Sequence, residues 1–524
     1  MTEPWWSGAT LYQIYVRSWK DSNGDGIGDL QGVISGLDHL EWLGVDGIWL
    51  SPTMPSPNRD WGYDVSDYYG VHPELGTEAD MARLIEEASW RGIRVLLDLV
   101  PNHTSDAHPW FVQARSDPSS PMRERYVWAK PGAGGGPPNN WRDATGASAW
   151  TLDEPSGQYY LHNFLPSQPD LDWWNGEVRA EFERILAYWF DRGVAGFRID
   201  VAHGLVKDSQ LRDDPEAGPE HHPMEVRSGL VPVYSANRPE VADIYRRWRR
   251  LADSYEPPRA LLGETWVLSP EGMARFYGEE ADQLQLCFNF GFLFADLSAG
   301  TMADLVRRTL ASLPEGATPL WTGSNHDVSR FPTRWAAGDE RRSRAALVML
   351  CALPGTVVLY YGDEIGMTDV EMPEERLLDE MAVLAGRTSR DHFRSPMQWS
   401  DRPNGGFAED GAPTWLPMGD CAALNVRAQR ADPRSTLHLC RTLLMLRRRG
   451  LASSGYRPLV EGPDVWAWEG ASRFVTAVNL SPRTAEVAGV TGTVVADTGD
   501  GGRRSVAERL VMEPWHAVVV EREG

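Results

Sequence analysis

Short apolar segments alternate with amphipathic segments along most of the chain. Eight of the apolar segments have the length and composition of β-strands: Leu11–Val16, Gly47–Leu50, Val95–Val100, Gly196–Val201, Ala260–Glu264, Leu284–Asn289, Leu320–Gly323 and Val357–Tyr360. Helical patterns lie between most of them, for example over Glu78–Arg91, Arg179–Arg192, Pro239–Ser254 and Met302–Ser312. Strands alternating with helices indicate a parallel sheet, and eight such units predict an α/β fold of the (β/α)8 TIM-barrel type.

Two segments interrupt this repeating pattern, and a third follows it. Residues 104–175, after the third strand, are rich in Pro, Gly, Asn and Trp and predict a small inserted subdomain. A second insertion, about 365–435, follows the eighth strand, so both leave the strand ends where barrel enzymes build their sites. Short strand-like runs between turn residues predict a C-terminal antiparallel β-domain over 454–524, which leaves 1–103 and 176–453 for the barrel.

Charge and composition exclude several classes of partner. The 524 residues include 51 Lys and Arg against 74 Asp and Glu, a net charge of −23, whereas nucleic acids and anionic membranes attract basic patches. No apolar run reaches the roughly 18 residues of a membrane span, and the first residues lack the pattern of a secretory signal. Four scattered cysteines without a CxxC pair predict reduced thiols and a cytoplasmic protein: Cys287, Cys351, Cys421 and Cys440.

Polar residues gather at the ends of four predicted strands. A single charged residue in such a place is most often a solvated strand end or a helix N-cap. Three acidic residues at three strand ends of one barrel, Asp200, Glu264 and Asp327, instead suggest a shared site. Further polar residues accompany them at the ends of the third, fourth and seventh strands: Asp98, Asn102, His103, Arg198, Asn325 and His326.

Strand geometry suggests different roles for two of these carboxyls. Side chains two residues apart share a face, so Arg198 and Asp200 point the same way, and we expect Arg198 to hold Asp200 ionised. If Glu264 faces Asp200, the neighbouring negative charge raises its pKa and keeps it protonated. An ionised carboxylate and a protonated carboxyl, about 5–5.5 Å apart, are what glycoside hydrolysis with retention requires.

Five ordered segments carry a family resemblance. Asp98–His103, Gly196–Asp200, Gly263–Glu264 and Asn325–Asp327 resemble the four signature regions of the α-amylase family of glycoside hydrolases. Gln168–Trp173 is similar to the further region that marks its α-glucosidase and oligo-1,6-glucosidase branch. The resemblance covers essentially the whole chain and implies a glycosidase of carbohydrate metabolism without an organic cofactor.

The resemblance also implies roles for single residues. Asp200 matches the catalytic nucleophile, Glu264 the acid/base, and Asp327 the third carboxylate, which binds ring hydroxyls and stabilises the transition state. Arg394 is similar to the arginine that closes the pocket over the non-reducing end, which favours exo cleavage; a surface salt bridge is its alternative. The other residues that match the subsite of the cleaved glucose are Asp60, Tyr63, His103, Phe164, Arg198 and His326. No HxH or HExxH spacing supports zinc binding by the histidines.

A loop after the first strand carries oxygen donors at alternate positions with glycine between them. This spacing suits a hard cation, although the EF-hand pattern fails because position twelve is Gly32. The loop resembles the structural Ca²⁺ or Mg²⁺ loop of the same branch, and a loop of Asx turns without an ion is the alternative. The implied ligands are Asp21, Asn23, Asp25, Asp29 and the backbone carbonyl of Ile27.

We therefore predict an exo-acting, retaining α-glucosidase that acts on short α-1,4- or α-1,6-linked glucosides of the maltose or isomaltose type. In the family, valine at the position of Val201 accompanies α-1,6 cleavage. However, Ala202–Gly204 depart from the family pattern and His203–Arg238 is unusually long, so the bond preference stays open. The oligomeric state also stays open. The alternatives are a transglycosylating or isomerising relative (trehalose synthase-like or sucrose-active), an inactive binding subunit and a metal-dependent barrel hydrolase.

Overall fold

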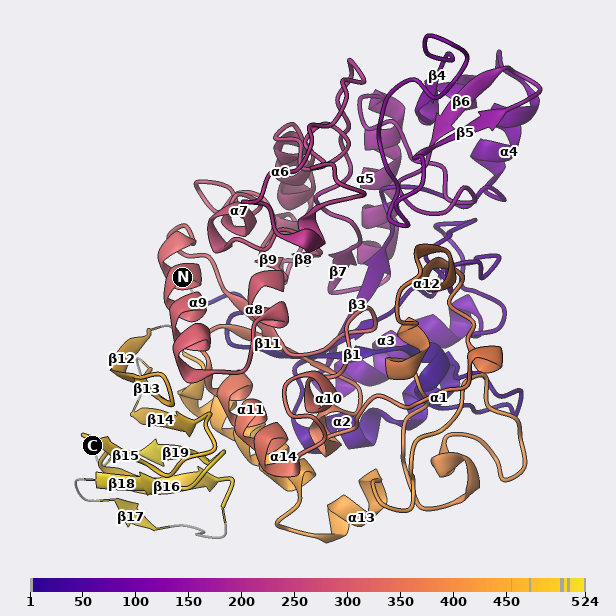
Figure 1. Cartoon of the computed structure of the whole chain (residues 1–524). Helices are drawn as coiled ribbons and strands as arrows, with labels where there is room; N and C mark the ends of the chain where they lie inside the picture. The colour runs from indigo at the N-terminus through magenta and orange to yellow at the C-terminus, as the bar shows by residue number, and fades with distance from the viewer. Residues whose placement is uncertain (1–2, 454, 471–472, 500–503, 507–508, 523–524) are drawn as a thin grey trace.

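The computed structural model describes residues 3–453, 455–470, 473–499, 504–506 and 509–522. In this part of the chain, eight parallel strands pair in the order β10-β11-β1-β2-β3-β7-β8-β9 and form a nearly closed barrel (Figure 1). The eight predicted strands and the TIM-barrel fold are thereby confirmed. The strands are β1 Thr10–Ile14, β2 Gly47–Leu50, β3 Arg94–Leu99, β7 Gly196–Ile199, β8 Ala260–Gly263, β9 Leu286–Cys287, β10 Leu320–Thr322 and β11 Thr356–Tyr360.

Helices lie around the barrel, and the four predicted ones are present with small shifts at their ends. Thr77 and Asp80 form a capping box that fixes the start of α3, and Asn175 caps α5 by accepting a hydrogen bond from Glu177. The α-helices are α1 Leu30–Ser35, α2 Leu37–Leu43, α3 Glu78–Trp90, α4 Pro109–Ser116, α5 Gly176–Asp191, α6 Val241–Asp253, α7 Pro270–Ala274, α8 Phe290–Phe294, α9 Ala299–Ser312, α10 Phe331–Arg334, α11 Glu340–Ala352, α12 Glu380–Ala385, α13 Val426–Ala431 and α14 Thr436–Leu446.

The barrel core follows the two-residue period of its strands. Phe197 and Ile199 of β7 pack into the large cluster between the strands and the helices. The alternate residue, Arg198, points inside the barrel, where Asp98 of β3 is its partner in the strand register. A buried arginine at this position needs carboxylates around it, because an unpaired buried charge is costly.

The two predicted insertions carry little regular structure. Residues 104–175 hold α4 and a three-stranded antiparallel sheet, β4-β6-β5, built from Trp128–Ala129, Gln158–Leu161 and Trp150–Asp153. In Figure 1 this sheet stands away from the barrel, at the upper right. The segment after β11 holds α12, α13 and short 3₁₀ turns, among them η6 (Arg390–Phe393). Both segments contribute residues to the candidate site described below.

The C-terminal region is antiparallel, as predicted, and contacts α9, α11 and α14 of the barrel. Residue 454, where the sequence prediction begins this region, lies outside the described residues. Across the residues described, no helix is long and apolar enough to cross a membrane. The four cysteines are free thiols. The strands form a six-stranded sheet, β12-β13-β14-β19-β16-β17, and the pair β15-β18: β12 Arg457–Glu461, β13 Val465–Glu469, β14 Phe474–Asn479, β15 Ala485–Ala488, β16 Gly492–Asp497, β17 Ser505–Val506, β18 Arg509–Met512 and β19 Ala517–Glu521.

Candidate active site

One guanidinium joins three carboxyl groups at the carboxyl ends of β3, β7 and β8. Nη1 of Arg198 lies 3.0 Å from Asp98 Oδ1 and 2.7 Å from Asp200 Oδ1. Nη2 of the same side chain lies 2.9 Å from Glu264 Oε1. Arg198 is 1% exposed, so its charge is balanced almost entirely by these neighbours. The structure thus brings Asp200 and Glu264, which are 64 positions apart in the chain, onto adjacent nitrogens of one side chain.

Burial raises the pKa values of the three carboxyl groups in this cluster. Burial raises the pKa of Asp200 well above its ordinary value, and the opposing charge of Arg198 does not cancel the rise because Glu264, Asp98 and Asp327 add to it. Burial likewise raises the pKa of Glu264, and it raises that of Asp98 to about 7. Arg198 is one cation shared by three carboxyls, which favours a proton within the cluster, and the expectation that Arg198 holds Asp200 ionised stays a prediction.

The residue after Asp200 touches the other carboxyl. The backbone N–H of Val201 donates a 2.8 Å hydrogen bond to Glu264 Oε2. Val201 has φ 46°, in the left-handed region that β-branched residues rarely adopt. Its side chain is 5% exposed and lies against Gly204, so Val201 is a core residue that also orients Glu264 through its backbone.

Asp327 lies on the opposite side of the site, among cations. Burial opposes its ionisation, but His326, Arg390 and Arg394 together hold the pKa of Asp327 below its ordinary value. His326 is fully buried, and its Nε2 lies 2.6 Å from the hydroxyl of Tyr63 and 3.1 Å from Asp327. The rings of Tyr63 and His326 stack with an interplanar angle of 2°. His326 thus holds the side chains of Tyr63 and Asp327 in place through its contacts with both.

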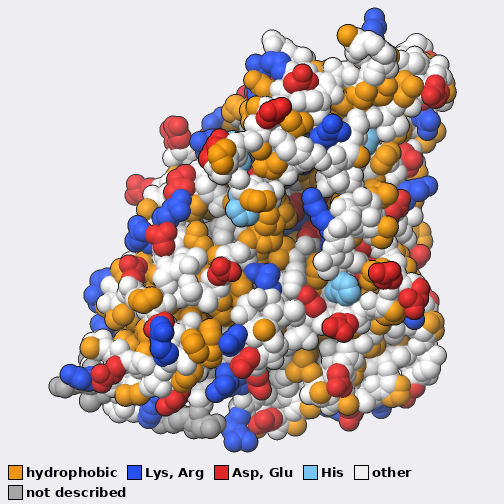
Figure 2. All heavy atoms as spheres, in the orientation of Figure 1, with side chains coloured by type: hydrophobic (Ala, Val, Ile, Leu, Met, Phe, Trp, Pro, Cys, Tyr) orange, Lys and Arg blue, Asp and Glu red, His pale blue; other side chains and the backbone are white. Residues whose placement is uncertain are grey.

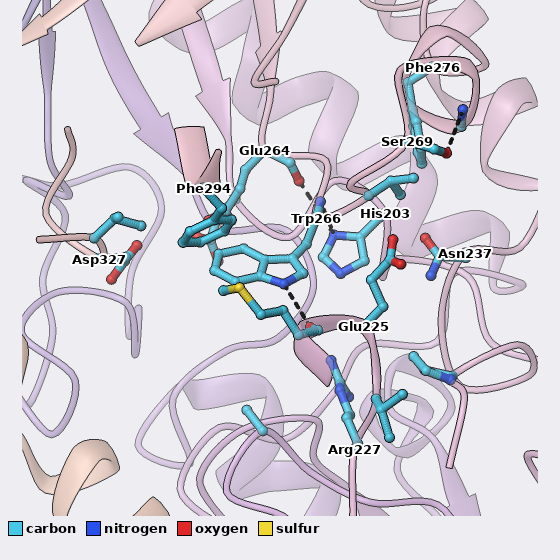
Figure 3. Close-up of a pocket in the computed structure, with 18 of the residues that line it drawn as sticks. His203, Glu225, Arg227, Asn237, Glu264, Trp266, Ser269, Phe276, Phe294 and Asp327 are labelled. Atoms are coloured by element: carbon cyan, nitrogen blue, oxygen red, sulfur yellow. Dashed lines mark hydrogen bonds between the residues drawn. The ribbon is translucent and has the colours of Figure 1, made fainter. Parts of the chain in front are cut away.

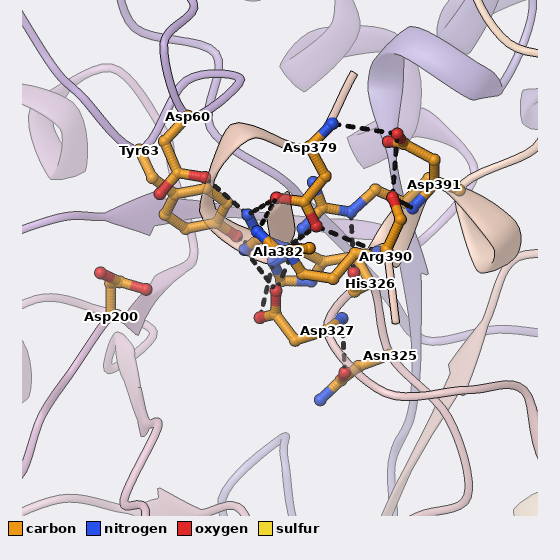
Figure 4. A network of polar contacts seen from close by, with 12 residues as sticks. Asp60, Tyr63, Asp200, Asn325, His326, Asp327, Asp379, Ala382, Arg390 and Asp391 are labelled. Atoms are coloured by element: carbon orange, nitrogen blue, oxygen red, sulfur yellow. Dashed lines mark hydrogen bonds and ion pairs between the residues drawn. The ribbon is translucent and has the colours of Figure 1, made fainter. Parts of the chain in front are cut away.

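The arginine that lines the cavity is Arg390, four residues before the predicted Arg394. Arg394 is fully buried, and its Nε and Nη2 donate to the carbonyl of His326 and to Asp327. Arg390 lines the cavity, and it lies 2.9 Å from Asp60 and 3.2 Å from Asp327 (Figure 4). The prediction for Arg394 is corrected in this respect: Arg394 does not line the cavity and donates to Asp327 from a fully buried position, whereas Arg390 is on the cavity wall.

A cavity of about 1760 Å³ brings most of the predicted site residues together, and Figure 2 shows the hollow on this face of the molecule. Gln168, from the fifth motif, donates to Asp60 at 3.1 Å and also lies 3.2 Å from His103, so it ties two walls of the pocket together. Arg198 and His326 do not line the cavity; they contact the residues that do. The predicted residues that line the cavity are Asp60, Tyr63, His103, Phe164, Asp200, Glu264 and Asp327.

The family model described as "Alpha amylase, catalytic domain" matches residues 13–454, which is most of the chain. The chain belongs to the α-amylase family. This family member is 41% identical over 459 residues to a probable α-glucosidase from Rhizobium meliloti, covering 85% of this chain and 82% of that one. It is 35% identical over 527 residues to an oligo-1,6-glucosidase from Parageobacillus thermoglucosidasius, covering 92% of both chains. It is therefore a glycoside hydrolase with α-glucosidases among its relatives.

Solved structures show the same fold. An α-glucosyl transfer enzyme superposes with a TM-score of 0.89 at 36% identity, covering 99% of this chain and 100% of that chain. The trehalulose synthase from Pseudomonas mesoacidophila superposes with a TM-score of 0.89 at 28% identity over the same shares. This α-amylase family fold thus also serves enzymes named for glucosyl transfer and for trehalulose synthesis.

The far half of the cavity in this glycoside hydrolase is built by a loop that the sequence motifs leave undescribed. The indole N–H of Trp266 donates to the Met224 carbonyl at 3.2 Å, and the Leu268 N–H donates to Glu225 at 2.9 Å. Arg227 connects the same loop to residues 104–175 by donating a hydrogen bond to the side chain of Asn163. Figure 3 shows Trp266, Glu225 and Arg227 around one hollow beside Glu264.

The predicted cation loop is formed as a loop of Asx turns. Both oxygens of Asp21 accept backbone N–H bonds, from Asn23, Gly24 and Gly26. Asp29 accepts bonds from Ser22 and Gly32. Among the residues described, no group of three or more His, Cys, Asp and Glu could hold a metal ion. The donor set has the chemistry that a hard cation prefers, so Ca²⁺ or Mg²⁺ binding by Asp21, Asn23, Asp25, Ile27 and Asp29 stays a prediction.

Proposed function

We propose that this chain is an exo-acting, retaining α-glucosidase that releases glucose from the non-reducing end of short α-1,4- or α-1,6-linked glucosides. The observation that supports it most is the shared contact of Asp200 and Glu264 with one guanidinium, at 2.7 and 2.9 Å. Two carboxyls held this closely suit direct attack by one of them, as in retaining enzymes, rather than attack by an interposed water.

The reaction runs through a glucosyl ester of Asp200. The Asp200 carboxylate attacks the anomeric carbon while Glu264 donates its proton to the glycosidic oxygen, which leaves with the aglycone. Positive charge that develops on the sugar ring beside Asp200 favours the ionised form of Asp200 and leaves the cluster's proton on Glu264. Water then attacks the anomeric carbon, gives its proton to Glu264 and releases glucose and the Asp200 carboxylate.

Asp327 and Arg390 support the sugar from the other side. Asp327 stays ionised, because His326 and the cations Arg390 and Arg394 hold its pKa low, and it can accept hydrogen bonds from ring hydroxyls. Arg390 pairs with Asp60 at 2.9 Å across the end of the pocket. Charged groups at that end can bind terminal hydroxyls and leave no passage for a longer chain, which supports exo cleavage.

The test is Asp200→Asn, with Asp253→Asn on the exposed face of α6 as the matched control. We expect Asp200→Asn to lose turnover of nitrophenyl α-glucoside by at least a thousand-fold, while its thermal unfolding and its binding of glucose stay unchanged. Asp253→Asn keeps full activity. Activity in Asp200→Asn close to that of the control contradicts the assignment of Asp200 as nucleophile.

A second candidate is transfer of the glucosyl group to another sugar, through the same Asp200 ester. The similarity to an α-glucosyl transfer enzyme, at 36% identity over 99% of this chain, favours it specifically. Product analysis with maltose, isomaltose, sucrose and trehalose separates the two. Two glucose molecules per bond cleaved in maltose, isomaltose or trehalose, and one glucose with one fructose per sucrose, support hydrolysis, whereas a new disaccharide or trisaccharide as the main product supports transfer.

A further inference from the structure

The guanidinium of Arg390 is held by a carboxylate that does not belong to the four signature regions. Asp379 Oδ2 accepts from Nε of Arg390 at 2.8 Å, and Asp379 Oδ1 accepts from Nη2 at 2.7 Å. The backbone N–H of Arg390 also donates to Asp379 at 3.0 Å. Figure 4 shows Asp379 on the side of Arg390 that faces away from Asp200. This two-point contact fixes the plane of the guanidinium, whereas Asp60 and Asp327 each accept from a single nitrogen.

Asp379 is itself held in place by its own chain segment. It is the N-cap of α12, where its side chain accepts from the Ala382 N–H at 3.3 Å. Its backbone N–H donates to Asp391 at 3.0 Å, and the Leu378 N–H donates to the same carboxylate oxygen. Asp379 is 1% exposed, so it presents almost no surface to a ligand. Its contacts point to Arg390 rather than to substrate.

Charge explains why this partner matters. Burial opposes the ionisation of Asp379, but the hydrogen bonds and the charge of Arg390 outweigh it and hold the pKa of Asp379 below its ordinary value. Arg390 in turn is partly buried, with its side chain 16% exposed, and its guanidinium pairs with both Asp60 and Asp327. A long arginine side chain that loses its two-point contact regains rotational freedom, which weakens both remaining contacts.

We propose that Asp379 is a positioning residue for the glycosidase reaction: it fixes Arg390 so that one guanidinium reaches Asp60 and Asp327 at the same time. Asp379 thereby couples the segment around α12 to the end of the glucose pocket. The inference rests on the proposed function, because it makes Asp379 hold the arginine, Arg390, that is proposed to bind the terminal glucose.

The experiment is a double-mutant cycle of Asp379→Asn and Arg390→Gln, assayed with nitrophenyl α-glucoside. Asparagine caps helices as well as aspartate does, so Asp379→Asn keeps the start of α12 while removing the charge. The matched control is Asp339→Asn, an N-cap of α11 away from the site. We expect Asp379→Asn to lower kcat/KM at least ten-fold, mainly by raising KM, and to lower it less than two-fold in the Arg390→Gln background.

Two outcomes overturn the inference: kcat/KM of Asp379→Asn within two-fold of that of Asp339→Asn, or an equal loss in both backgrounds, which would mean that Asp379 acts independently of Arg390. If Asp379→Asn does not fold, Asp379→Ser, which also caps a helix, is taken through the same cycle. A wild-type protein that releases no glucose from any α-glucoside contradicts the proposed function itself. An active wild type with an uncoupled cycle contradicts only the role of Asp379.

Discussion

Val201 N–H lies 2.8 Å from Oε2 of Glu264, and this bond joins the peptide after Asp200 to the other catalytic carboxyl. The backbone of Val201 is in the left-handed region, at φ 46°, which costs a β-branched residue about 1–3 kcal/mol. The surrounding barrel end therefore holds a strained peptide in the position that presents its N–H to Glu264. Strain of this kind is maintained where the geometry serves a site.

Replacing Val201 by glycine tests this relationship. Glycine adopts positive φ without strain, but it lets the peptide move and weakens its hydrogen bond to Glu264. Because that bond lowers the pKa of Glu264, its loss raises this pKa, and the basic limb of the kcat/KM profile moves to higher pH. The free energy of unfolding should fall by about 2–4 kcal/mol, because the loss of the buried side chain and the added chain entropy outweigh the relief of strain. A basic limb that stays in place or moves to lower pH contradicts this role.

Arg390 and Arg394 differ in burial, and their substitutions should differ accordingly. Arg390→Gln is expected to lower kcat/KM by about a hundred-fold, because a charged hydrogen bond to substrate and to Asp327 is lost, and to lower the free energy of unfolding less than Arg394→Gln does, because the Arg390 side chain is 16% exposed. Arg394→Gln removes a fully buried cation from Asp327 and should lower the free energy of unfolding by about 3–5 kcal/mol. Kinetics and denaturant unfolding of both variants check this; equal stability losses contradict it.

A buried carboxyl away from the active site makes stability depend on pH. Asp363 is fully buried, burial raises its pKa to about 7, and its Oδ2 accepts from the Tyr360 N–H. The unfolded chain releases this proton near pH 3.9, so the stabilising difference is complete below that pH and is lost as pH rises to about 7. Relative to Asp363→Asn, the wild type should lose up to about 4 kcal/mol of unfolding free energy between pH 4 and 7. Denaturant unfolding at both pH values measures it, and a constant difference contradicts it.

The cation loop predicts an effect on stability rather than on chemistry. Treatment with a chelator should lower the unfolding temperature by several degrees, and added Ca²⁺ or Mg²⁺ should restore it, since an ion that binds only the folded state stabilises that state. The kcat of the protein that remains folded should not change, because the loop contains no catalytic residue. Asp25→Ala is expected to abolish the response to the ion. If neither the chelator nor the cation changes the unfolding temperature, the loop consists of Asx turns without a bound ion.

The sequence predicted the barrel and the grouping of the three carboxyls, because strand periodicity fixes which side chains face inward and parallel strands end at one edge. It assigned the pocket arginine to Arg394 because motif similarity does not show which of two arginines, four residues apart, reaches the cavity. It missed the raised pKa of Asp200 because the cost of burial depends on the whole surrounding fold. The sequence showed where the loop around Trp266 and Glu225 lies in the chain, but it could not predict the conformation of that loop, since the conformation depends on contacts with residues 104–175.

The central claim is that Asp200 forms a covalent bond with glucose during turnover. A fluorinated α-glucosyl fluoride, which forms the ester faster than water removes it, should leave a glucosyl adduct of one sugar per chain after denaturation. Peptide mass spectrometry should place that adduct on Asp200, with none in Asp200→Asn. An active enzyme that accumulates no adduct, or carries it on another residue, contradicts the account.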